Sequence, residues 1–203
     1  MKSVLKLLGA AAFVAAAHAP AASASVIVNG SFEANTQAAG TWAIYPNLVG
    51  WTGGQYGIEL RNNVAGKAYD GVNYIELDTT HNSIASQVIG TLSQMYTITF
   101  AYSPRTGVAA SSNGIEVFWN NISQGVFSGN GTPGGNNWQL YTIRVLGTDP
   151  TSTLMFKAVG TSDSYGGSLD AVSISSVPEP ASLALLGLGL AGIGFARRKQ
   201  KKA

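Results

Sequence analysis

The sequence predicts an all-β protein: a single antiparallel β-sandwich of the jelly-roll type, flanked by two hydrophobic terminal segments. Short runs of alternating apolar and polar residues recur between residues 25 and 176, and no stretch there keeps a helical period of 3.6 residues. Only 11% of the 203 residues are charged, and glycine occurs 25 times, well above its usual share of about 7%. About 150 residues are enough for one domain with its own core.

The first element is residues 1–24, which have the three parts of a secretory signal peptide. Lys2 and Lys6 come first, an apolar run over 7–17 follows, and the segment ends in small residues at Ala22-Ser23-Ala24. We expect cleavage after Ala24 and export of the remaining chain. The alternative is a buried N-terminal helix.

The strands are the next elements, and each is separated from its neighbour by a turn. In 95–102, for example, Tyr96, Ile98, Phe100 and Tyr102 alternate with smaller or more polar residues. Asn120-Asn121 predicts a tight hairpin, and 128–137 is a loop of Gly, Asn and Pro. The clearest predicted strands are 71–77, 84–89, 95–102, 115–119, 122–127, 138–146, 153–158 and 168–175. Eight or more antiparallel strands favour a jelly roll over an immunoglobulin-like sandwich, whose Cys-Trp-Cys marker is missing.

The last element starts at Val177-Pro178-Glu179-Pro180 and continues with sixteen uncharged, mostly apolar residues over 181–196. A basic cluster, Arg197-Arg198-Lys199-Gln200-Lys201-Lys202, follows. As a helix the apolar segment would be roughly 24 Å long, a little short of the ~30 Å hydrocarbon core. The basic cluster would stay in the cytoplasm by the positive-inside rule.

These C-terminal residues resemble the PEP-CTERM sorting signal of Gram-negative bacteria. The resemblance implies recognition by an exosortase-type sorting protease and transient insertion of the helix into the inner membrane. It also implies cleavage near Pro178, Glu179 and Pro180 and delivery to the cell surface or the extracellular polysaccharide matrix. An ordinary C-terminal membrane anchor would leave the Pro-Glu-Pro unexplained. The expected organisation is therefore a signal peptide at 1–24, a sandwich at 25–176 and a sorting signal at 177–203.

Charge and cysteine content exclude several classes of function. Seven of the 12 Lys and Arg residues lie in the terminal segments, which leaves five basic against nine acidic residues over 25–176, a net charge of −4. Binding to nucleic acid through phosphate contacts is therefore not expected. The absence of cysteine excludes disulfide scaffolds, thiol enzymes and cysteine-ligated metals.

A second resemblance covers nearly the whole of the middle segment. Six motifs come in the order seen in galactose-binding-like jelly rolls, which include carbohydrate-binding modules; these family members often have Asp where Ala171 stands. The resemblance implies a non-catalytic module that binds polysaccharide. The six motifs are Asn29-Gly30-Ser31-Phe32-Glu33, Gly50-Trp51, 71–78, Tyr96 to Phe100 running into Ser103-Pro104-Arg105, 138–145, and Leu169-Asp170-Ala171-Val172.

Recognisable catalytic motifs are missing, and we do not expect an enzyme. His81 is the only histidine beyond the signal peptide, and it lies in a polar turn. The sequence has no Gly-x-Ser-x-Gly elbow, His-Glu-x-x-His motif or P-loop. A glycoside hydrolase built on Glu59, Glu76 or Glu116 stays open as an alternative. Alternating strand carboxylates, however, usually belong to the solvated face.

The resemblance gives Glu33 and Asp170 a candidate role as metal ligands. It would place the first and last strands side by side, and oxygen ligands suit a structural calcium ion. The alternative is that the two carboxylates cap strand ends or pair with basic residues.

Sugar binding requires flat aromatic faces and planar polar groups. We predict a ligand site at Trp42, Tyr69 and Arg105, although a salt bridge to a strand carboxylate would also explain Arg105. Trp51, Phe100 and Trp138 lie in apolar patterns and are assigned to the core. The wider candidates are Tyr45, Tyr56, Trp119 and Tyr165 among the aromatics and Arg61, Asn62 and Asn63 among the polar residues.

The sequence therefore leads to a main hypothesis, an exported, non-catalytic polysaccharide-binding module, and to an alternative. In the alternative, the protein is structural matrix or biofilm material that anchors and self-associates without a specific glycan ligand. Charged side chains on edge strands prevent sheets from pairing, and this sequence has few of them. Weakly protected edges would favour the self-association of the second hypothesis.

Overall fold

The structure is a computed structural model that describes residues 27–177, 187, 189 and 190. Ser23–Val177 forms one compact unit with its own core. The predicted signal peptide, the Pro178-Glu179-Pro180 motif and nearly all of the predicted apolar helix lie outside the described residues. In the part of the chain that is described, no helix is long and apolar enough to cross a membrane.

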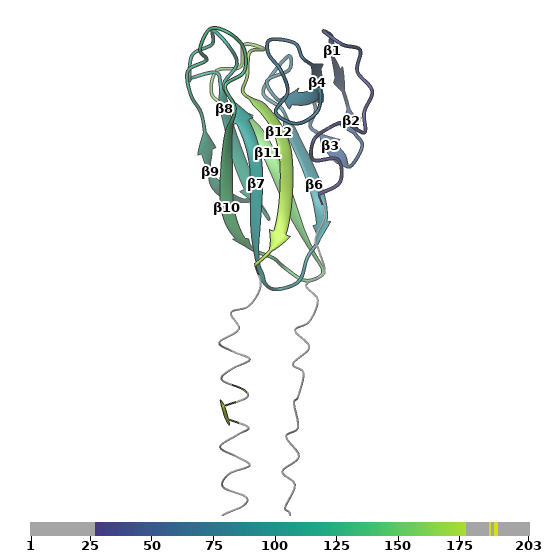
Figure 1. The fold of residues 1–203 in the computed structure, drawn as a ribbon, viewed down its shortest axis with the longest axis vertical. Helices are drawn as coiled ribbons and strands as arrows, with labels where there is room; N and C mark the ends of the chain where they lie inside the picture. The colour runs from purple at the N-terminus through teal and green to yellow at the C-terminus, as the bar shows by residue number, and fades with distance from the viewer. Residues whose placement is uncertain (1–26, 178–186, 188, 191–203) are drawn as a thin grey trace, which may run out of the picture. The chain divides into compact units, whose positions relative to one another are not determined.

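Within residues 27–177, twelve strands form two antiparallel six-stranded sheets that face each other (Figure 1). One sheet has the order β1-β4-β5-β12-β7-β10 and the other the order β2-β3-β6-β11-β8-β9. The strands are β1 (Trp42–Tyr45), β2 (Asn47–Leu48), β3 (Trp51–Gly53), β4 (Ile58–Asn62), β5 (Asn73–Glu76), β6 (Ile84–Gly90), β7 (Met95–Ser103), β8 (Gly114–Trp119), β9 (Ile122–Phe127), β10 (Gln139–Leu146), β11 (Thr151–Val159) and β12 (Ser168–Ser176). The all-β sandwich is confirmed.

The predicted strands from 84 onward agree with the structure to within two residues at each end. The Asn120-Asn121 hairpin is also confirmed, since both residues have positive φ, 50° and 64°. The prediction of a strand over 71–77 was too long: β5 begins at Asn73, because Gly71 turns the chain at φ +72°. Strands β1 to β4 were missed. The first three are only two to four residues long, which is too short for an alternation pattern.

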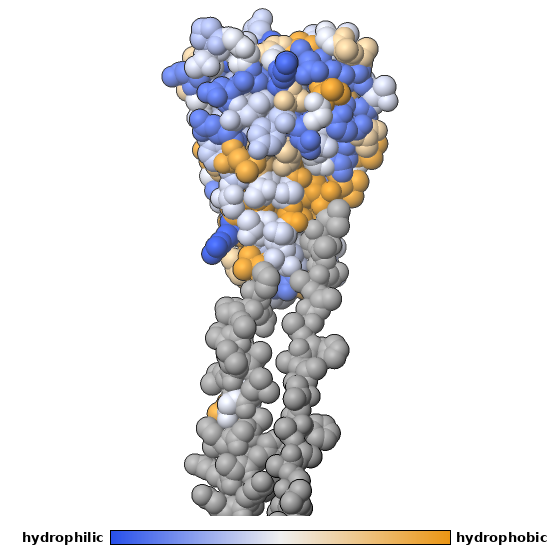
Figure 2. Space-filling model, in the orientation of Figure 1, coloured by the Kyte–Doolittle hydropathy of each residue, from blue (hydrophilic) through white to orange (hydrophobic). Residues whose placement is uncertain are grey.

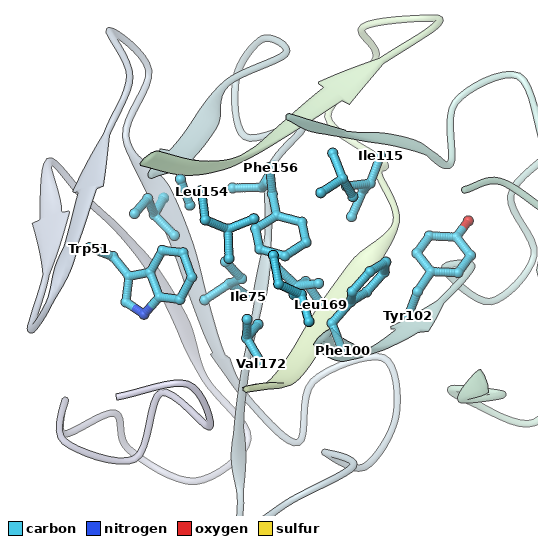
Figure 3. Packing of buried hydrophobic residues seen from close by; sticks show 14 of the residues in the cluster. Trp51, Ile75, Phe100, Tyr102, Ile115, Leu154, Phe156, Leu169 and Val172 are labelled. Atoms are coloured by element: carbon cyan, nitrogen blue, oxygen red, sulfur yellow. The ribbon is translucent and has the colours of Figure 1, made fainter. Parts of the chain in front are cut away.

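The core fills the space between the sheets (Figure 3). Phe100 and Phe156 meet edge to face at 5.3 Å, and Trp51 packs against Phe156 at 6.1 Å. The core assignments of Trp51 and Phe100 are confirmed. Trp119 was a candidate sugar contact, but it is only 3% exposed and its indole Nε1 donates to the Leu146 carbonyl.

Trp138 was assigned to the core, and this was wrong. It lies just before β10, half-buried outside the sheet, and contacts Tyr74 and Tyr69 edge to face. Its indole N–H donates to the Lys67 carbonyl at 2.8 Å. The strand predicted over 138–146 begins one residue later, at Gln139, because Trp138 bonds the loop at Lys67 instead of entering the core.

Candidate functional site

A buried row of charges lies on the first sheet, on the face that points away from the core. β4 alternates Ile58 and Leu60, which enter the core, with Glu59 and Arg61 on the opposite face. Register pairs Glu59 with Glu76 of β5. The Arg61 guanidinium contacts both carboxylates, with Nε 2.6 Å from Glu59 Oε1 and Nη2 3.1 Å from Glu76 Oε2.

These residues are as buried as the core: Glu59, Arg61 and Glu76 are each at most 3% exposed. We expected strand carboxylates to lie on a solvated face, and for Glu59 and Glu76 this was wrong. Arg61 and Asn62 were candidates for sugar contact, but both are buried. Burial raises the pKa of Glu76 to about 7, although Arg61 and Arg105 act in the opposite direction.

Arg105 links this buried row to the surface. Its Nη1 lies 3.0 and 3.2 Å from the two oxygens of Glu76 and also donates to the Ser164 carbonyl. The guanidinium carbon stands 4.4 Å from the ring centre of Tyr165, which is half exposed. The salt bridge weighed from the sequence is therefore present, and it fixes the orientation of the guanidinium group.

Arg105 and Tyr165 line an open pocket of about 650 Å³ at the loop end of the sandwich. Thr106, Ser111, Thr161 and Asp163 also line it, and the Thr106 hydroxyl donates to the Thr132 carbonyl. Figure 2 shows hydrophilic residues gathered around these loops at the top of the domain and more hydrophobic residues lower down. The pocket thus combines a fixed cation, an exposed aromatic ring and several hydroxyls, which can hydrogen-bond a polar ligand.

Acidic side chains at strand ends hold the loops around the pocket in place. Asp78 Oδ2 accepts the backbone N–H of Asp163 at 2.9 Å, and its Oδ1 accepts the hydroxyl of Ser162. Glu76 Oε1 accepts the N–H of Gly166 at 2.8 Å. Since Asp78 and Glu76 are both 0% exposed, the 161–167 loop is fixed by hydrogen bonds to buried carboxyl groups.

Glu33 and Asp170 hold a second loop in the same way. Glu33 Oε1 accepts the N–H groups of Val72 and Asn73, and Asp170 Oδ2 accepts those of Tyr69 and Asp70, all within 2.9 Å. A bulge in β12 between Asp170 and Ser173 separates the two paired segments of this strand. The two carboxylates therefore bind neighbouring N–H groups at the C-terminal end of the 63–72 loop, where β5 begins.

This geometry bears on the calcium expectation. The oxygens of Asp170 already accept three N–H groups, because Oδ1 bonds Ala171, and burial raises the pKa of Asp170 to about 7. In the described residues no group of three or more His, Asp or Glu side chains is placed to hold a metal. These contacts match the alternative of capping carboxylates, and the calcium ion stays a prediction.

The three residues chosen as a ligand site do not share one pocket. Arg105 lines the pocket described above, whereas Trp42 is 52% exposed on β1 and Tyr69, 48% exposed, lies beside Trp138. Tyr165 was among the wider aromatic candidates and is the one that meets Arg105. Sixty residues separate the two in sequence, and buried carboxyl groups bring them together: Glu76 binds Arg105 and the Gly166 N–H, and Asp78 accepts the Tyr165 N–H.

Comparison with known proteins supports both the terminal signal and the fold. Residues 176–199 match the PEP-CTERM protein-sorting motif. A 154-residue stretch is 29% identical to the multifunctional-autoprocessing repeats-in-toxin of Vibrio vulnificus; it covers 75% of this chain but only 3% of the toxin.

Two examples from the solved structures with a similar fold are a cyclase and a carbohydrate-binding module. The Stig cyclase Fisc from Fischerella sp. TAU has a TM-score of 0.57 at 14% identity, over 77% of this chain and 98% of the cyclase. TmCBM61, solved with beta-1,4-galactotriose, has a TM-score of 0.51 at 15% identity, over 73% of this chain and 96% of the module. The chain therefore carries a PEP-CTERM sorting motif, typical of exported proteins processed at the membrane, behind a β-sandwich with the fold of carbohydrate-binding modules.

Proposed function

We propose that this protein is an exported surface or matrix protein whose sandwich binds polysaccharide without cleaving it. An exosortase-type protease would process the chain at the sorting motif. The observation that carries the proposal is the Arg105 and Tyr165 pocket, in which Glu76 holds the guanidinium fixed before any ligand arrives. A fixed donor loses little side-chain entropy on binding, which favours recognition of sugar hydroxyls in a shallow site.

The buried carboxylates support a non-catalytic role. Glu59 and Glu76 are bonded to Arg61 and are at most 3% exposed, so neither can reach a glycosidic bond. Asp163 is the acidic residue in the pocket lining, and its two oxygens accept Ser112 Oγ and the Tyr165 N–H. Hydrolysis by paired carboxylates needs two acids that flank the substrate, and the pocket lining supplies one.

The test is retardation of the domain in native gels that contain soluble polysaccharides, including that of the producing cell. We expect weak binding of the parent, with dissociation constants in the micromolar to millimolar range, about 4 to 8 kcal/mol. Tyr165→Ala and Arg105→Lys should each raise the dissociation constant obtained from the retardation at least tenfold. The matched control is Tyr56→Ala, since Tyr56 is also an exposed tyrosine but stacks on His81 outside the pocket.

Trp42→Ala and Tyr69→Ala complete the set, because they test the site expected from the sequence. Loss of binding in these two variants but not in Tyr165→Ala would move the site away from the pocket. A parent that no polysaccharide retards would contradict the proposal. Release of reducing ends from any polysaccharide would instead revive the hydrolase alternative.

A further inference from the structure

The sandwich has four edge strands, and three of them are poor templates for pairing with another chain. β1 and β2 are only four and two residues long. β9 carries a register shift opposite Val117 and Phe118, where Gly125 has a φ of +127°. Short and bulged edges are common ways in which native proteins prevent sheets from associating.

β10 has none of these protections. Its register with β7 runs without interruption from Gln139↔Tyr102 to Leu146↔Met95. The strand is eight residues long, contains no proline and has one charged residue, Arg144. No other described strand pairs with its far side, so the backbone N–H and C=O groups on that side have no strand partner; one of them, the Leu146 carbonyl, accepts the Trp119 indole N–H.

The side chains on the outer face of β10 are self-complementary in one antiparallel register. Leu140, Thr142, Arg144 and Leu146 alternate with Tyr141, Ile143 and Val145, which face the core. If Ile143 pairs with its own copy about a twofold axis, each Leu140 lies opposite Leu146 and each Thr142 lies opposite Arg144. Both leucines are more than half exposed in the single chain, at 56% and 60%.

We propose that two copies of this domain associate through their β10 strands, antiparallel and in this register. Two leucine pairs would become buried, and the two guanidinium groups would face threonine hydroxyls rather than each other. Pairing Arg144 with its own copy would instead place like charges opposite each other and leave both leucines without an apolar partner. The other edge strands are too short or too bulged to cover eight residues, so a second β10 is the partner that fits.

The first test is sedimentation equilibrium of the 23–177 domain and of the processed protein released by cells. We expect both to dimerise, and Leu140→Lys and Leu146→Lys each to weaken dimerisation at least tenfold. Val88→Lys is the matched control, because Val88 is 67% exposed on β6, which lies inside its sheet. A parent that stays monomeric up to millimolar concentration, or a control that weakens the dimer equally, would overturn the proposal.

The second test fixes the register and exploits the absence of cysteine in the sequence. Leu140→Cys and Leu146→Cys chains are mixed and oxidised gently, and the disulfide-linked products are separated by mass. Directly opposed residues lie about 4.5–5.5 Å apart at Cα, within disulfide range. We expect the mixed 140–146 dimer to dominate. A predominance of 140–140 or 146–146 dimers would refute this register, since those pairs would be six residues apart along the strand.

Discussion

Arg61 is the residue whose removal tests the buried charge row most directly. Its Nε and Nη2 bind Glu59, and Nη2 also binds Glu76, while its Nη1 has no hydrogen-bond partner. In Arg61→Met the aliphatic volume is largely kept, but two buried carboxylates would face each other without a guanidinium between them. Removing one member of a buried ion pair costs about 3–5 kcal/mol. For a domain of this size the melting temperature should fall by roughly 6–20 °C.

The loss should also depend on pH. Burial already raises the pKa values of Glu59 and Glu76, and Arg61 lowers them, so the variant should have still higher values. An acid whose pKa is higher in the folded state than in the unfolded chain stabilises the fold at low pH, and this stability is lost as pH rises through the folded pKa. Arg61→Met should therefore be more strongly destabilised at pH 8 than at pH 5, where the carboxyls take up protons.

Urea unfolding followed by tryptophan fluorescence measures this loss, since Trp51 and Trp119 are buried in the core. Arg144→Met is the matched control, because Arg144 is exposed on β10, and it should change stability by less than about 0.5 kcal/mol at low micromolar protein. If Arg61→Met unfolds at the same urea concentration as the control, or loses equal stability at both pH values, the charge row does not act as argued.

Three further predictions concern pH, calcium and processing. Burial raises the pKa values of Asp170 and Glu76 to about 7, so both carboxyls should make the stability of the parent fall as pH rises from about 4 to 7. Asp170→Asn should remove the contribution of Asp170 and make this profile less steep; an unchanged profile would contradict the assignment. If calcium binds only the folded domain, a hundredfold excess over Kd should add about 2.7 kcal/mol, and Glu33→Gln and Asp170→Asn should abolish the rise in melting temperature if these residues are the ligands. Intact-mass measurement of the exported protein should give a chain that begins near Ser25 and ends between Val177 and Pro180, and a basic tail that is still attached would disprove sorting.

The sequence alone determined the fold class and the C-terminal sorting motif, whereas the signal peptide at 1–24 stays a prediction. A strand with one apolar face alternates with period two, and Tyr96 to Tyr102 shows this because only one side of β7 enters the core. The sorting motif is equally readable, since its order of Pro-Glu-Pro, apolar run and basic cluster needs no tertiary contact. Strands β1 to β3 were not predicted, because two to four residues are too few to show the two-residue alternation of a strand.

The tertiary structure alone decided which polar residues are buried and which of them meet. Alternation in β4 and β5 separates two faces, but it does not say that the second face is also removed from water at Glu59, Arg61 and Glu76. Arg105 and Tyr165 meet at one pocket because Glu76 binds Arg105 and the Gly166 N–H, while Asp78 accepts the Tyr165 N–H, and these contacts span residues distant in sequence. Such contacts depend on how the fold brings distant parts of the chain together. The local alternation of apolar and polar residues does not encode that arrangement.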